Sequence, residues 1–259
     1  MYKMQNRIDT LFQTKKNNII SIYYTAGYPT LNDTLTIAKE LQQCGIDMLE
    51  IGMPFSDPLA DGPTIQSSSE LAIKNGMTIE VLFNQLKDLR QHIKIPVILM
   101  GYYNPILQFG SDKFFKKAVE LGIDGVIIPD LPIDDYRENY QSLFSDTGLK
   151  NILLITPQTS DSRIHLIDAI SGGFIYAVSS ASTTGSAENK LLEQEEYLNN
   201  ISQMNLKNPF IVGFGINNVR DLHFVSRYAN GAIIGSAFVR AITTGNLKNQ
   251  IRNFIKPLL

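Results

Sequence analysis

Residues Leu49–Pro63 read LEIGMPFSDPLADGP, an apolar strand that runs into a loop with two aspartates and three prolines. Glu50 lies inside the apolar run, although a buried, unpaired charge is strongly disfavoured in an ordinary core. A carboxylate at the end of a strand, facing other carboxylates across a stiff loop, is instead typical of an acid/base site. The same alternation of apolar strand and polar loop recurs along the chain and indicates the fold.

Short apolar segments alternate with longer amphipathic ones. Eight apolar segments have the length and β-branched character of strands: Asn18–Thr25, Asp47–Met53, Pro96–Tyr102, Gly125–Asp130, Asn151–Thr156, Phe174–Ser179, Pro209–Gly215 and Gly231–Gly235. Helical patterns between them include Thr34–Gln43, Asp112–Leu121, Asp134–Phe144, Asp161–Ile170 and Val219–Tyr228. Nearly continuous apolar strands suit a parallel sheet covered on both faces. Eight such units in about 250 residues predict an α/β fold, the (β/α)8 TIM barrel, with a doubly wound open sheet as the alternative.

Two features refine this prediction. A helix at Gln5–Phe12 precedes the first strand and is expected to cap the bottom of the barrel. The long connection after the second strand, Asp57–Asn75, is expected to be a large loop with its own short helix. Since no linker, low-complexity run or charge block divides the chain, we expect a single TIM-barrel domain over residues 1–259.

The bulk composition excludes several classes of protein. With 23 basic and 25 acidic residues the formal charge is −2, so neither nucleic acid nor an anionic membrane is indicated as a partner. The one cysteine, Cys44, excludes an internal disulfide framework and suits a reducing cytoplasm. The N-terminus lacks the apolar core of a signal peptide, and no run approaches the roughly 20 apolar residues of a membrane helix. The sequence therefore predicts a cytoplasmic protein.

Polar residues at the predicted strand ends are the candidates for chemistry, because barrels carry their sites there. Glu50 lies near the end of the second strand and is either a general acid/base with a raised pKa or a structural carboxylate that caps loop amides. Asp61 is either functional or part of an Asp-Gly-Pro turn. The remaining candidates are a loop aspartate, a helix-capping aspartate, a tyrosine within the sixth strand and two residues after the third: Asp57, Asp130, Tyr176, Tyr102 and Asn104.

Glycines indicate a phosphate site. Gly213-Phe214-Gly215-Ile216 ends the seventh strand, and Gly235-Ser236-Ala237-Phe238 ends the eighth and opens a helix. Glycine lets backbone amides approach an anion, and a helix N-terminus adds unpaired N–H groups. Loops after strands seven and eight form the recurrent phosphate site of such barrels, to which Thr184-Gly185 would add an amide. The alternative is that these glycines only turn the chain.

Other kinds of chemistry find little support in the sequence. The histidines, His92, His165 and His223, lie in helical patterns, and no cluster has metal-ligand spacing. No GxGxxG follows the first strand, which disfavours a dinucleotide fold. No lysine stands at a predicted strand end, so a Schiff-base aldolase would lack its nucleophile. Any carbon–carbon cleavage here would therefore use acid/base chemistry alone.

The segment Leu49–Gln66 closely resembles the signature of the tryptophan synthase alpha subunit family. Further matches are spread over essentially the whole chain: TAGYP at Thr25–Pro29, MGYYNP at Met100–Pro105, PDLP at Pro129–Pro132, GFGI at Gly213–Ile216 and GSA at Gly235–Ala237. The long motif is specific, whereas many phosphate-binding barrels share the glycine motifs. The resemblance implies a lyase of tryptophan biosynthesis that cleaves indole-3-glycerol phosphate to indole and glyceraldehyde 3-phosphate by retro-aldol chemistry.

The resemblance also implies roles for individual residues. Glu50 matches the acid that protonates the leaving carbon of indole, and Asp61 matches the carboxylate that accepts the indole N–H. Tyr176 matches a third catalytic-site residue. Phosphate-loop positions match Gly185, Gly215, Gly235 and Ser236. Apolar walls for indole are expected from Tyr23, Met100, Ile128 and Phe214.

The loop after the sixth predicted strand departs from the family pattern. The family commonly has Ser-Arg-x-Gly-Val-Thr-Gly, whereas this chain has SSASTTG at Ser179–Gly185, without the arginine and the early glycine. Thr184, which in the family's closed lid contacts the residue matching Asp61, is retained. We expect a working site with altered loop dynamics.

The family's alpha subunit works with a beta subunit that carries pyridoxal phosphate (PLP) and joins indole to serine. The resemblance thus implies an α2β2 heterotetramer, no cofactor in this chain, and a docking face around Asp57 and the loop after strand six. Two rivals stay open: another phosphate-handling barrel, such as an isomerase of histidine or tryptophan biosynthesis, and a regulatory subunit that mainly activates a beta partner.

Overall fold

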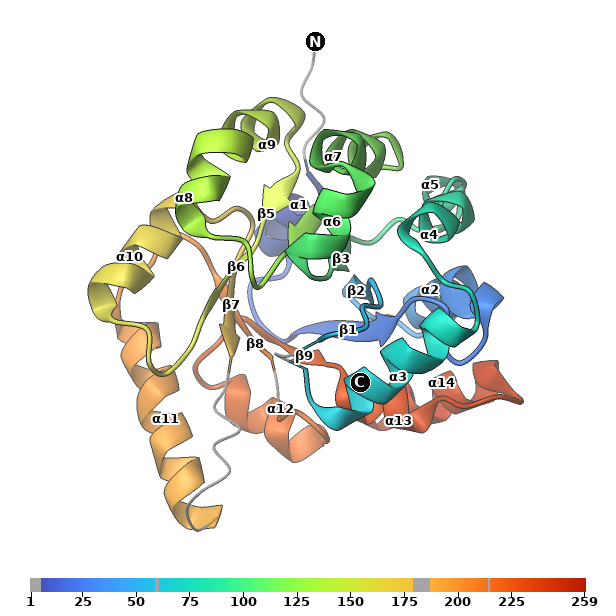
Figure 1. Ribbon diagram of the computed structural model, residues 1–259. Helices are drawn as coiled ribbons and strands as arrows, with labels where there is room; N and C mark the ends of the chain where they lie inside the picture. The colour runs from blue at the N-terminus through green and yellow to red at the C-terminus, as the bar shows by residue number, and fades with distance from the viewer. Residues whose placement is uncertain (1–5, 59–60, 179–186, 214) are drawn as a thin grey trace.

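The computed structural model describes residues 6–58, 61–178, 187–213 and 215–259, with only the backbone of 187–192. Within these ranges the strands form one parallel sheet, ringed by helices (Figure 1). The strands are β1 (Ile19–Thr25), β2 (Met48–Gly52), β3 (Val97–Met100), β4 (Gly125–Ile127), β5 (Lys150–Asn151), β6 (Leu153–Ile155), β7 (Ile175–Val178), β8 (Phe210–Gly213) and β9 (Gly231–Ile234). Each lies within one of the eight predicted strands or, for β5, begins one residue before it.

The sheet closes into a barrel where the fifth predicted strand is interrupted. Its order is β5-β4-β3-β2-β1-β9-β8-β7-β6, so the two outermost strands are consecutive in the chain. Between them, the Ile152 N–H still donates to the Val126 carbonyl at 3.0 Å, whereas the Leu153 N–H donates to the Ser171 hydroxyl at 3.3 Å. The backbone thus passes from pairing with β4 to pairing with β7. The predicted (β/α)8 barrel is confirmed, and the open sheet is excluded.

The helices connect the strands and, apart from the first, cover the outside of the barrel. They are α1 (Arg7–Thr14), η1 (Leu31–Asp33), α2 (Thr34–Gln43), α3 (Pro63–Lys74), α4 (Ile79–Gln85), α5 (Leu89–His92), α6 (Tyr103–Phe109), α7 (Ser111–Glu120), α8 (Ile133–Asp135), η2 (Tyr136–Tyr140), α9 (Gln141–Thr147), α10 (Asp161–Ile170), α11 (Ala187–Gln203), α12 (Val219–Val225), α13 (Ser236–Ala241), α14 (Leu247–Ile255) and η3 (Lys256–Leu258). In the described ranges, no helix is both long and apolar enough to cross a membrane.

Two helical predictions need adjustment. The inserted helix after β2 is α3, but it has twelve residues and is not short, because Pro63 starts it at once after the Asp61 turn. The predicted helix Asp134–Phe144 is helical throughout, yet its middle, η2, is a π-helical turn between α8 and α9. Both differences lie in segments that follow the C-terminal ends of strands.

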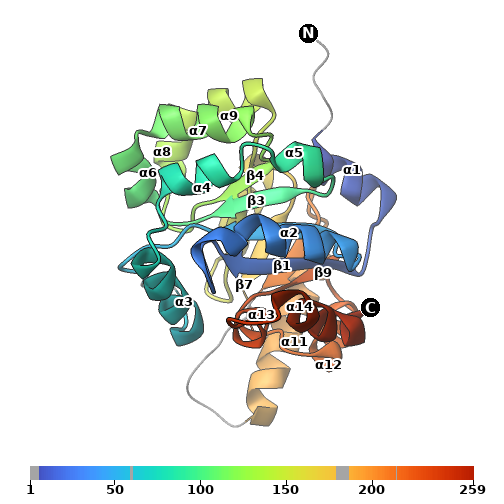
Figure 2. The same ribbon diagram turned by 90° about the vertical axis from the view of Figure 1, so that its right-hand side faces the viewer.

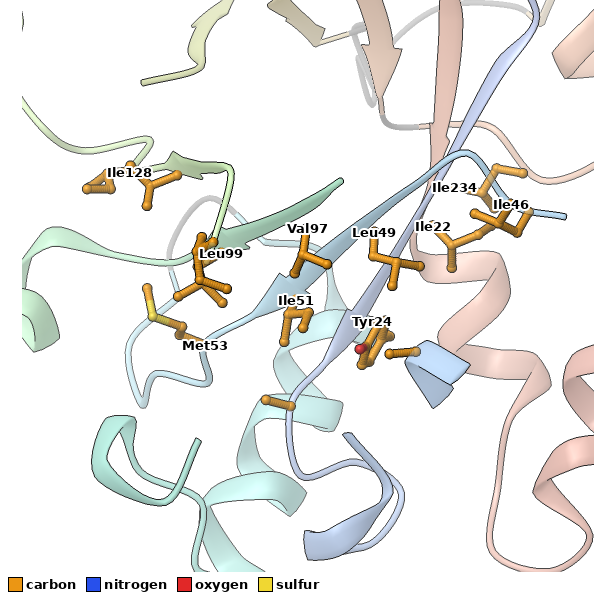
Figure 3. Close-up of a cluster of buried hydrophobic side chains, with 14 of the residues drawn as sticks. Ile22, Tyr24, Ile46, Leu49, Ile51, Met53, Val97, Leu99, Ile128 and Ile234 are labelled. Atoms are coloured by element: carbon orange, nitrogen blue, oxygen red, sulfur yellow. The ribbon is translucent and has the colours of Figure 1, made fainter. Parts of the chain in front are cut away.

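Alternation along the strands separates an outer core from an inner one. On β2, Leu49 and Ile51 pack in the large cluster between the sheet and the helices, where Figure 3 shows them beside Val97 and Leu99. Met48 instead belongs to the smaller cluster inside the barrel. Because side chains alternate with a period of two, Glu50 must point inward as Met48 does. The strand therefore carries its carboxylate into the barrel interior.

The first helix closes the bottom of the barrel, as predicted. Ile8 of α1 is fully buried in the inner cluster, and the Phe12 ring lies 6.0 Å from the ring of Phe174 at the start of β7. Asn6 caps the helix by accepting a hydrogen bond from the Ile8 N–H. In Figure 2, α1 and α3 lie at opposite ends of the strands. The interior is thus sealed at the N-terminal end of the barrel.

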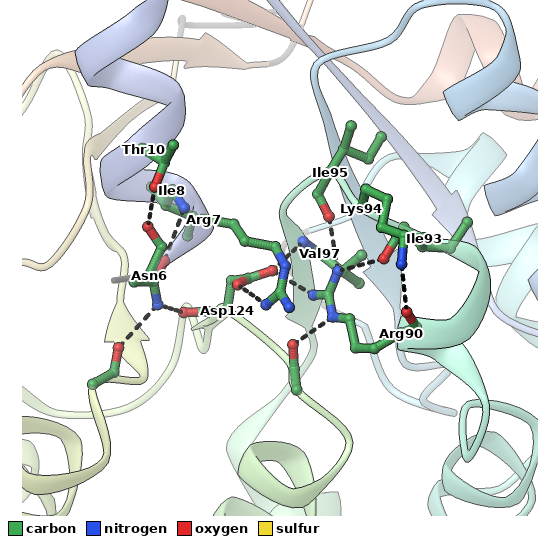
Figure 4. Close-up of polar contacts among 12 residues, drawn as sticks. Asn6, Arg7, Ile8, Thr10, Arg90, Ile93, Lys94, Ile95, Val97 and Asp124 are labelled. Atoms are coloured by element: carbon green, nitrogen blue, oxygen red, sulfur yellow. Dashed lines mark hydrogen bonds and ion pairs between the residues drawn. The ribbon is translucent and has the colours of Figure 1, made fainter. Parts of the chain in front are cut away.

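A buried carboxylate, Asp124, fixes this closed end (Figure 4). One of its oxygens accepts from Arg7 of α1 at 3.0 Å, and the other accepts from Arg90 of α5 and from the Val97 N–H. Arg90 also donates to three backbone carbonyls in the α5–β3 and α7–β4 connections. Because both carboxylate oxygens are occupied, the charge is compensated, and α1 is tied to the ends of β3 and β4.

We expect Asp124→Ala to destabilise the protein by roughly 3 kcal/mol, because removing one partner leaves cations without their counter-charge in a partly buried setting. The measurement is the free energy of unfolding from urea titration. Glu120→Ala is the control, since it removes an exposed i,i+3 pair with Lys117 and should cost under about 0.5 kcal/mol. Equal unfolding midpoints for the two variants would show that the Asp124 cluster does not fix the closed end.

Candidate active site

Glu50 lies inside the barrel and is completely shielded from solvent. Its Oε1 accepts a hydrogen bond of 2.8 Å from the hydroxyl of Ser21 on β1. Its Oε2 has no hydrogen-bond partner among the described residues. Burial raises the pKa of the carboxyl to about 8, against the opposing effect of the Ser21 hydrogen bond, which favours the ionised form. Near neutral pH this group holds a proton that it can donate.

Asp61 follows in the loop after β2 and has a different environment. Its N–H donates to the Pro58 carbonyl at 3.0 Å, and its own carbonyl accepts from the Gln66 side chain at 2.8 Å. Burial raises the pKa of its carboxyl to about 6, while a hydrogen bond from the Tyr102 side chain lowers it. The loop geometry therefore holds a carboxylate that is mostly ionised near neutral pH.

Two tyrosines approach the site from β1 and β7, and each lies over a glycine of the next strand. A Cβ atom on Gly52 would lie 2.1 Å from the Tyr23 hydroxyl oxygen, and one on Gly213 would lie 2.0 Å from that of Tyr176. Only glycine leaves room for these phenols. Burial raises the pKa of both, with smaller contributions from the nearby Asp61 and Glu50 carboxyls. Both phenols therefore stay neutral.

A pocket opens at the C-terminal ends of the strands. It is lined by residues of β1, β3, β7 and β9, of the loops after β2, β8 and β9, and of the first turns of α3 and α13: Tyr23, Asp61, Ile65, Met100, Tyr176, Gly215, Ile216, Asn217, Ile233, Gly235 and Ser236. A second pocket adjoins it and shares Tyr23, Asp61 and Met100. Its other lining residues are mostly apolar or aromatic: Met53, Gly101, Tyr102, Pro129, Leu154, Thr156 and Val178. The combined cavity has an apolar side suited to a flat aromatic ring.

The opposite side of the cavity is suited to an anion. Gly235 directly precedes α13. The first intrahelical hydrogen bond there runs from the Val239 N–H to the Gly235 carbonyl at 3.0 Å, so the N–H groups before Val239 have no partner within the helix. Gly215 has a φ of +76°, which glycine adopts without strain. Its carbonyl accepts from the Asn217 side chain at 2.8 Å, and Arg240 of α13 donates to Asn217 at 3.0 Å. Asn217 and Arg240 thus connect the loop after β8 to α13, and residues of both segments line the same pocket.

The structure brings most of the predicted site residues together. Asp61, Tyr176, Gly215, Gly235 and Ser236 line the main pocket, and so do Tyr23 and Met100 from the predicted apolar wall. Glu50 lines neither pocket but lies in the interior, close enough for its charge to raise the pKa of Tyr23 and of Tyr176. Gly185, Thr184 and Phe214 lie outside the described residues.

Ile128 does not reach the pocket. It is buried in the outer core, beside Leu99 in Figure 3. Its neighbour Ile127 belongs to the inner cluster. Because neighbouring side chains along a strand point to opposite faces, Ile128 faces the outer core, and the expectation that it forms part of the indole wall was wrong.

The other polar candidates have structural roles or lie on the surface. The Asp130 carboxylate accepts from the Tyr103 N–H at 2.8 Å at the start of α6, and Asp57 accepts from the neighbouring Ser56 hydroxyl. His92, His165 and His223 are exposed. Within the described ranges, no group of three or more His, Cys, Asp or Glu side chains is arranged to hold a metal ion.

Sequence reasoning missed Ser21, and it named Tyr102 without a role. Ser21 is a small polar residue in an otherwise apolar first strand, two positions before Tyr23 and hence on the same face. That spacing was the available signal. Its contact with Glu50 depends on the register between β1 and β2, which the sequence does not specify.

The fold and the cavity define a (β/α)8 barrel with an acidic pocket at the C-terminal ends of its strands. Residues 8–257 match the family model described as tryptophan synthase alpha chain. The tryptophan synthase alpha chain of Flavobacterium psychrophilum is 55% identical over 253 residues, which cover 98% of this chain and 99% of that protein. That of Parabacteroides distasonis is 52% identical, with 92% of each chain covered. This chain therefore belongs to the tryptophan synthase alpha chain family.

Solved structures agree with this assignment. Tryptophan synthase subunit alpha from Legionella pneumophila superposes with a TM-score of 0.87 at 32% identity, covering 98% of this chain and 97% of that one. A chain of tryptophan synthase from M. tuberculosis, in an aminoacrylate-bound form, superposes with a TM-score of 0.85 at 26% identity and 98% coverage of both.

We expect Gly52→Ala to destabilise the protein by about 1–3 kcal/mol, because the new methyl group would displace the Tyr23 phenol from the pocket wall. Unfolding in urea provides the measurement. Gly62→Ala is the control, since a Cβ there meets no atom within 4 Å. A Gly52→Ala variant as stable as Gly62→Ala would contradict the close packing of Tyr23 over Gly52.

The raised pKa of Glu50 also predicts how stability varies with pH. Between its ordinary value of 4.5 and about 8, the folded protein retains a proton that the unfolded chain has released, so stability falls as the pH rises through this window. Asp61 acts in the same direction only up to about 6. Wild type should therefore lose more unfolding free energy than Glu50→Gln between about pH 6.5 and 8. Parallel stability curves for the two proteins would show that the Glu50 pKa is not raised.

Proposed function

We propose that this alpha chain is the lyase subunit that cleaves indole-3-glycerol phosphate to indole and glyceraldehyde 3-phosphate in tryptophan biosynthesis, with Glu50 as its acid/base. The observation that carries the proposal is the complete burial of the Glu50 carboxyl in an apolar interior near Tyr23 and Tyr176, which line the pocket; this burial raises its pKa to about 8. A general acid is most effective when its pKa lies near the operating pH. The family assignment supplies the substrate.

Each part of the cavity matches a part of that substrate. The phosphate is assigned to the amides around Gly215, Gly235 and Ser236, where backbone N–H groups favour an anion without needing lysine. The indole ring is assigned to the apolar side, between Tyr23, Met100 and the lining of the second pocket. The carboxylate of Asp61, which lines both pockets, is placed between these two ends.

The reaction then follows from two proton transfers. Glu50 gives its proton to the indole carbon that carries the side chain, which places positive charge on the ring, and ionised Asp61 accepts the indole N–H and stabilises that charge. The carbon–carbon bond to the side chain breaks, and its electrons restore the aromatic ring. The side-chain hydroxyl next to the broken bond becomes the aldehyde and returns its proton to Glu50. The acid is thus regenerated, and no cofactor in this chain is needed.

The product suggests the partner. Indole is apolar and would be lost to solution, so we infer that it passes to a PLP-containing beta subunit in an α2β2 heterotetramer, as the resemblance of the sequence to the family implies. The pocket mouth, near the exposed Asp57 loop, is the expected docking face. The lid role of Thr184, the cytoplasmic location and the single domain over residues 1–259 stay predictions.

The test is release of indole from indole-3-glycerol phosphate, with and without a matched beta subunit. Glu50→Gln should lower the rate by about 10²–10⁴-fold, since it removes the proton donor but keeps the side-chain shape. Asp61→Asn should also lower turnover, because a neutral amide cannot stabilise the positive ring.

Activation of the beta subunit serves as the control for folding and assembly. Glu50→Gln should still activate it, because Glu50 lies in the interior and not on the docking face. If wild type releases no indole even with the beta subunit present, the lyase assignment is wrong. If Glu50→Gln retains full turnover, Glu50 is not the acid. The regulatory rival gains support if wild-type turnover is negligible while the beta subunit is still activated.

A further inference from the structure

Ser21 makes the one polar contact that the structure gives Glu50 among its described residues. We propose that Ser21 is a positioning residue for the reaction: its hydroxyl holds Oε1 of Glu50 and thereby assigns the transferred proton to Oε2. This inference rests on the proposed role of Glu50 as the acid. It concerns which oxygen carries the proton and what stabilises the carboxylate after the proton has left.

The contact is built into the pairing of β1 with β2. In this parallel pair Tyr23 lies opposite Glu50, and Ser21 lies opposite Met48. Ser21 and Tyr23 are two residues apart and share the inward face, so the Ser21 side chain lies on the same face as Glu50, one step nearer the closed end. Neither Ser21 nor Glu50 has any exposed surface. Water therefore does not compete for this 2.8 Å hydrogen bond.

Hydrogen-bonding capacity then distinguishes the two carboxyl oxygens. A protonated carboxyl has one O–H donor, and its other oxygen acts as an acceptor. Oε1 already accepts from Ser21, whereas Oε2 has no partner in the described part of the chain. The proton is therefore placed on Oε2, the oxygen that the described residues leave without a hydrogen bond. When Glu50 is ionised, the same Ser21 hydrogen bond stabilises the negative charge.

Among the groups around Glu50, Ser21 is the main one that lowers its pKa against the effect of burial. Burial raises the pKa of Glu50, and the Ser21 hydrogen bond lowers it. Among the described residues, the titratable groups that interact with Glu50 are the phenols of Tyr23 on β1 and Tyr176 on β7, both kept neutral by burial. Asp61 interacts with these same phenols from the loop after β2. The inward side chains of the adjacent strand β3, Ile98 and Met100, are apolar.

The experiment follows the Glu50 carboxyl directly and measures turnover separately. The carbon-13 NMR signal of Glu50 is assigned by its loss in Glu50→Gln and titrated in wild type, Ser21→Ala and Ser21→Thr. Ser21→Ala should raise the pKa of Glu50, because the ionised form loses the Ser21 donor. With the beta subunit present, kcat should fall about tenfold while KM changes less than about twofold, as expected when an interaction at the reacting group is lost.

The pH profile adds a readout that a purely structural serine would not change. As a general acid, Glu50 loses activity when the pH rises through its pKa, so Ser21→Ala should move this alkaline limb to higher pH. Ser21→Thr retains the hydroxyl and should restore both the titration and kcat. Ser171→Ala is the matched control, because it removes a buried hydroxyl that bonds only backbone groups near the closed end. It should leave the titration and the pH profile of wild type unchanged.

Two results would overturn the proposal. One is a Ser21→Ala protein whose Glu50 titrates as in wild type; the other is a shifted titration with unchanged kcat and alkaline limb. Should Ser21→Ala fail to fold, Ser21→Cys, which has similar size and is a weak donor, is measured in its place. Failure of the proposed function is seen separately, as full turnover in Glu50→Gln, whereas the titration reports the Ser21 contact whatever the turnover.

Discussion

The burial of one carboxyl group inside an apolar barrel is the constraint on which the site depends. Glu50 points inward because the parallel ladder alternates side chains, and among the described residues Ser21 is its one hydrogen-bond donor. Such an environment favours the neutral acid, so the fold itself sets the protonation state. The same interior accommodates the Tyr23 and Tyr176 phenols only because the adjoining strands have glycine where a Cβ would collide. The chemistry and the packing of this region are therefore determined together.

The two ends of the barrel have different roles: the closed end holds stabilising contacts, and the open end holds the site. At the closed end Asp124 is fully hydrogen-bonded and compensated by two arginines, and α1 fills the interior with Ile8. At the open end one oxygen of Glu50 has no hydrogen-bond partner among the described residues, and the loops after β2, β8 and β9 line the cavity. Rigid fixation at one end allows exposed amides and a partly unsatisfied carboxyl to be kept at the other.

Much of the fold could be predicted because each strand is a continuous apolar run bounded by polar or glycine residues. The barrel, its capping helix and the clustering of Asp61, Tyr176, Gly215, Gly235 and Ser236 all follow from that pattern. Finer features could not be predicted, since they depend on register and closure. The break at Ile152 arises where one strand changes partner, Ile128 faces outward by one residue of register, and Ser21 meets Glu50 only through the β1–β2 pairing.

The two acids of the site show how a single fold assigns different roles to similar groups. Both pKa values are raised by burial, yet Glu50 reaches about 8 in the sealed interior, whereas Asp61 reaches about 6 in a loop where Tyr102 donates to it. Near neutral pH the first is mainly protonated and the second mainly ionised. A proton donor and a carboxylate acceptor therefore coexist near one cavity. An acid/base pair needs two pKa values separated in this way. If the two carboxyls had the same pKa, both would be mainly protonated or both mainly ionised at a given pH. Either the proton donor for the carbon or the carboxylate that stabilises the resulting cation would then be missing.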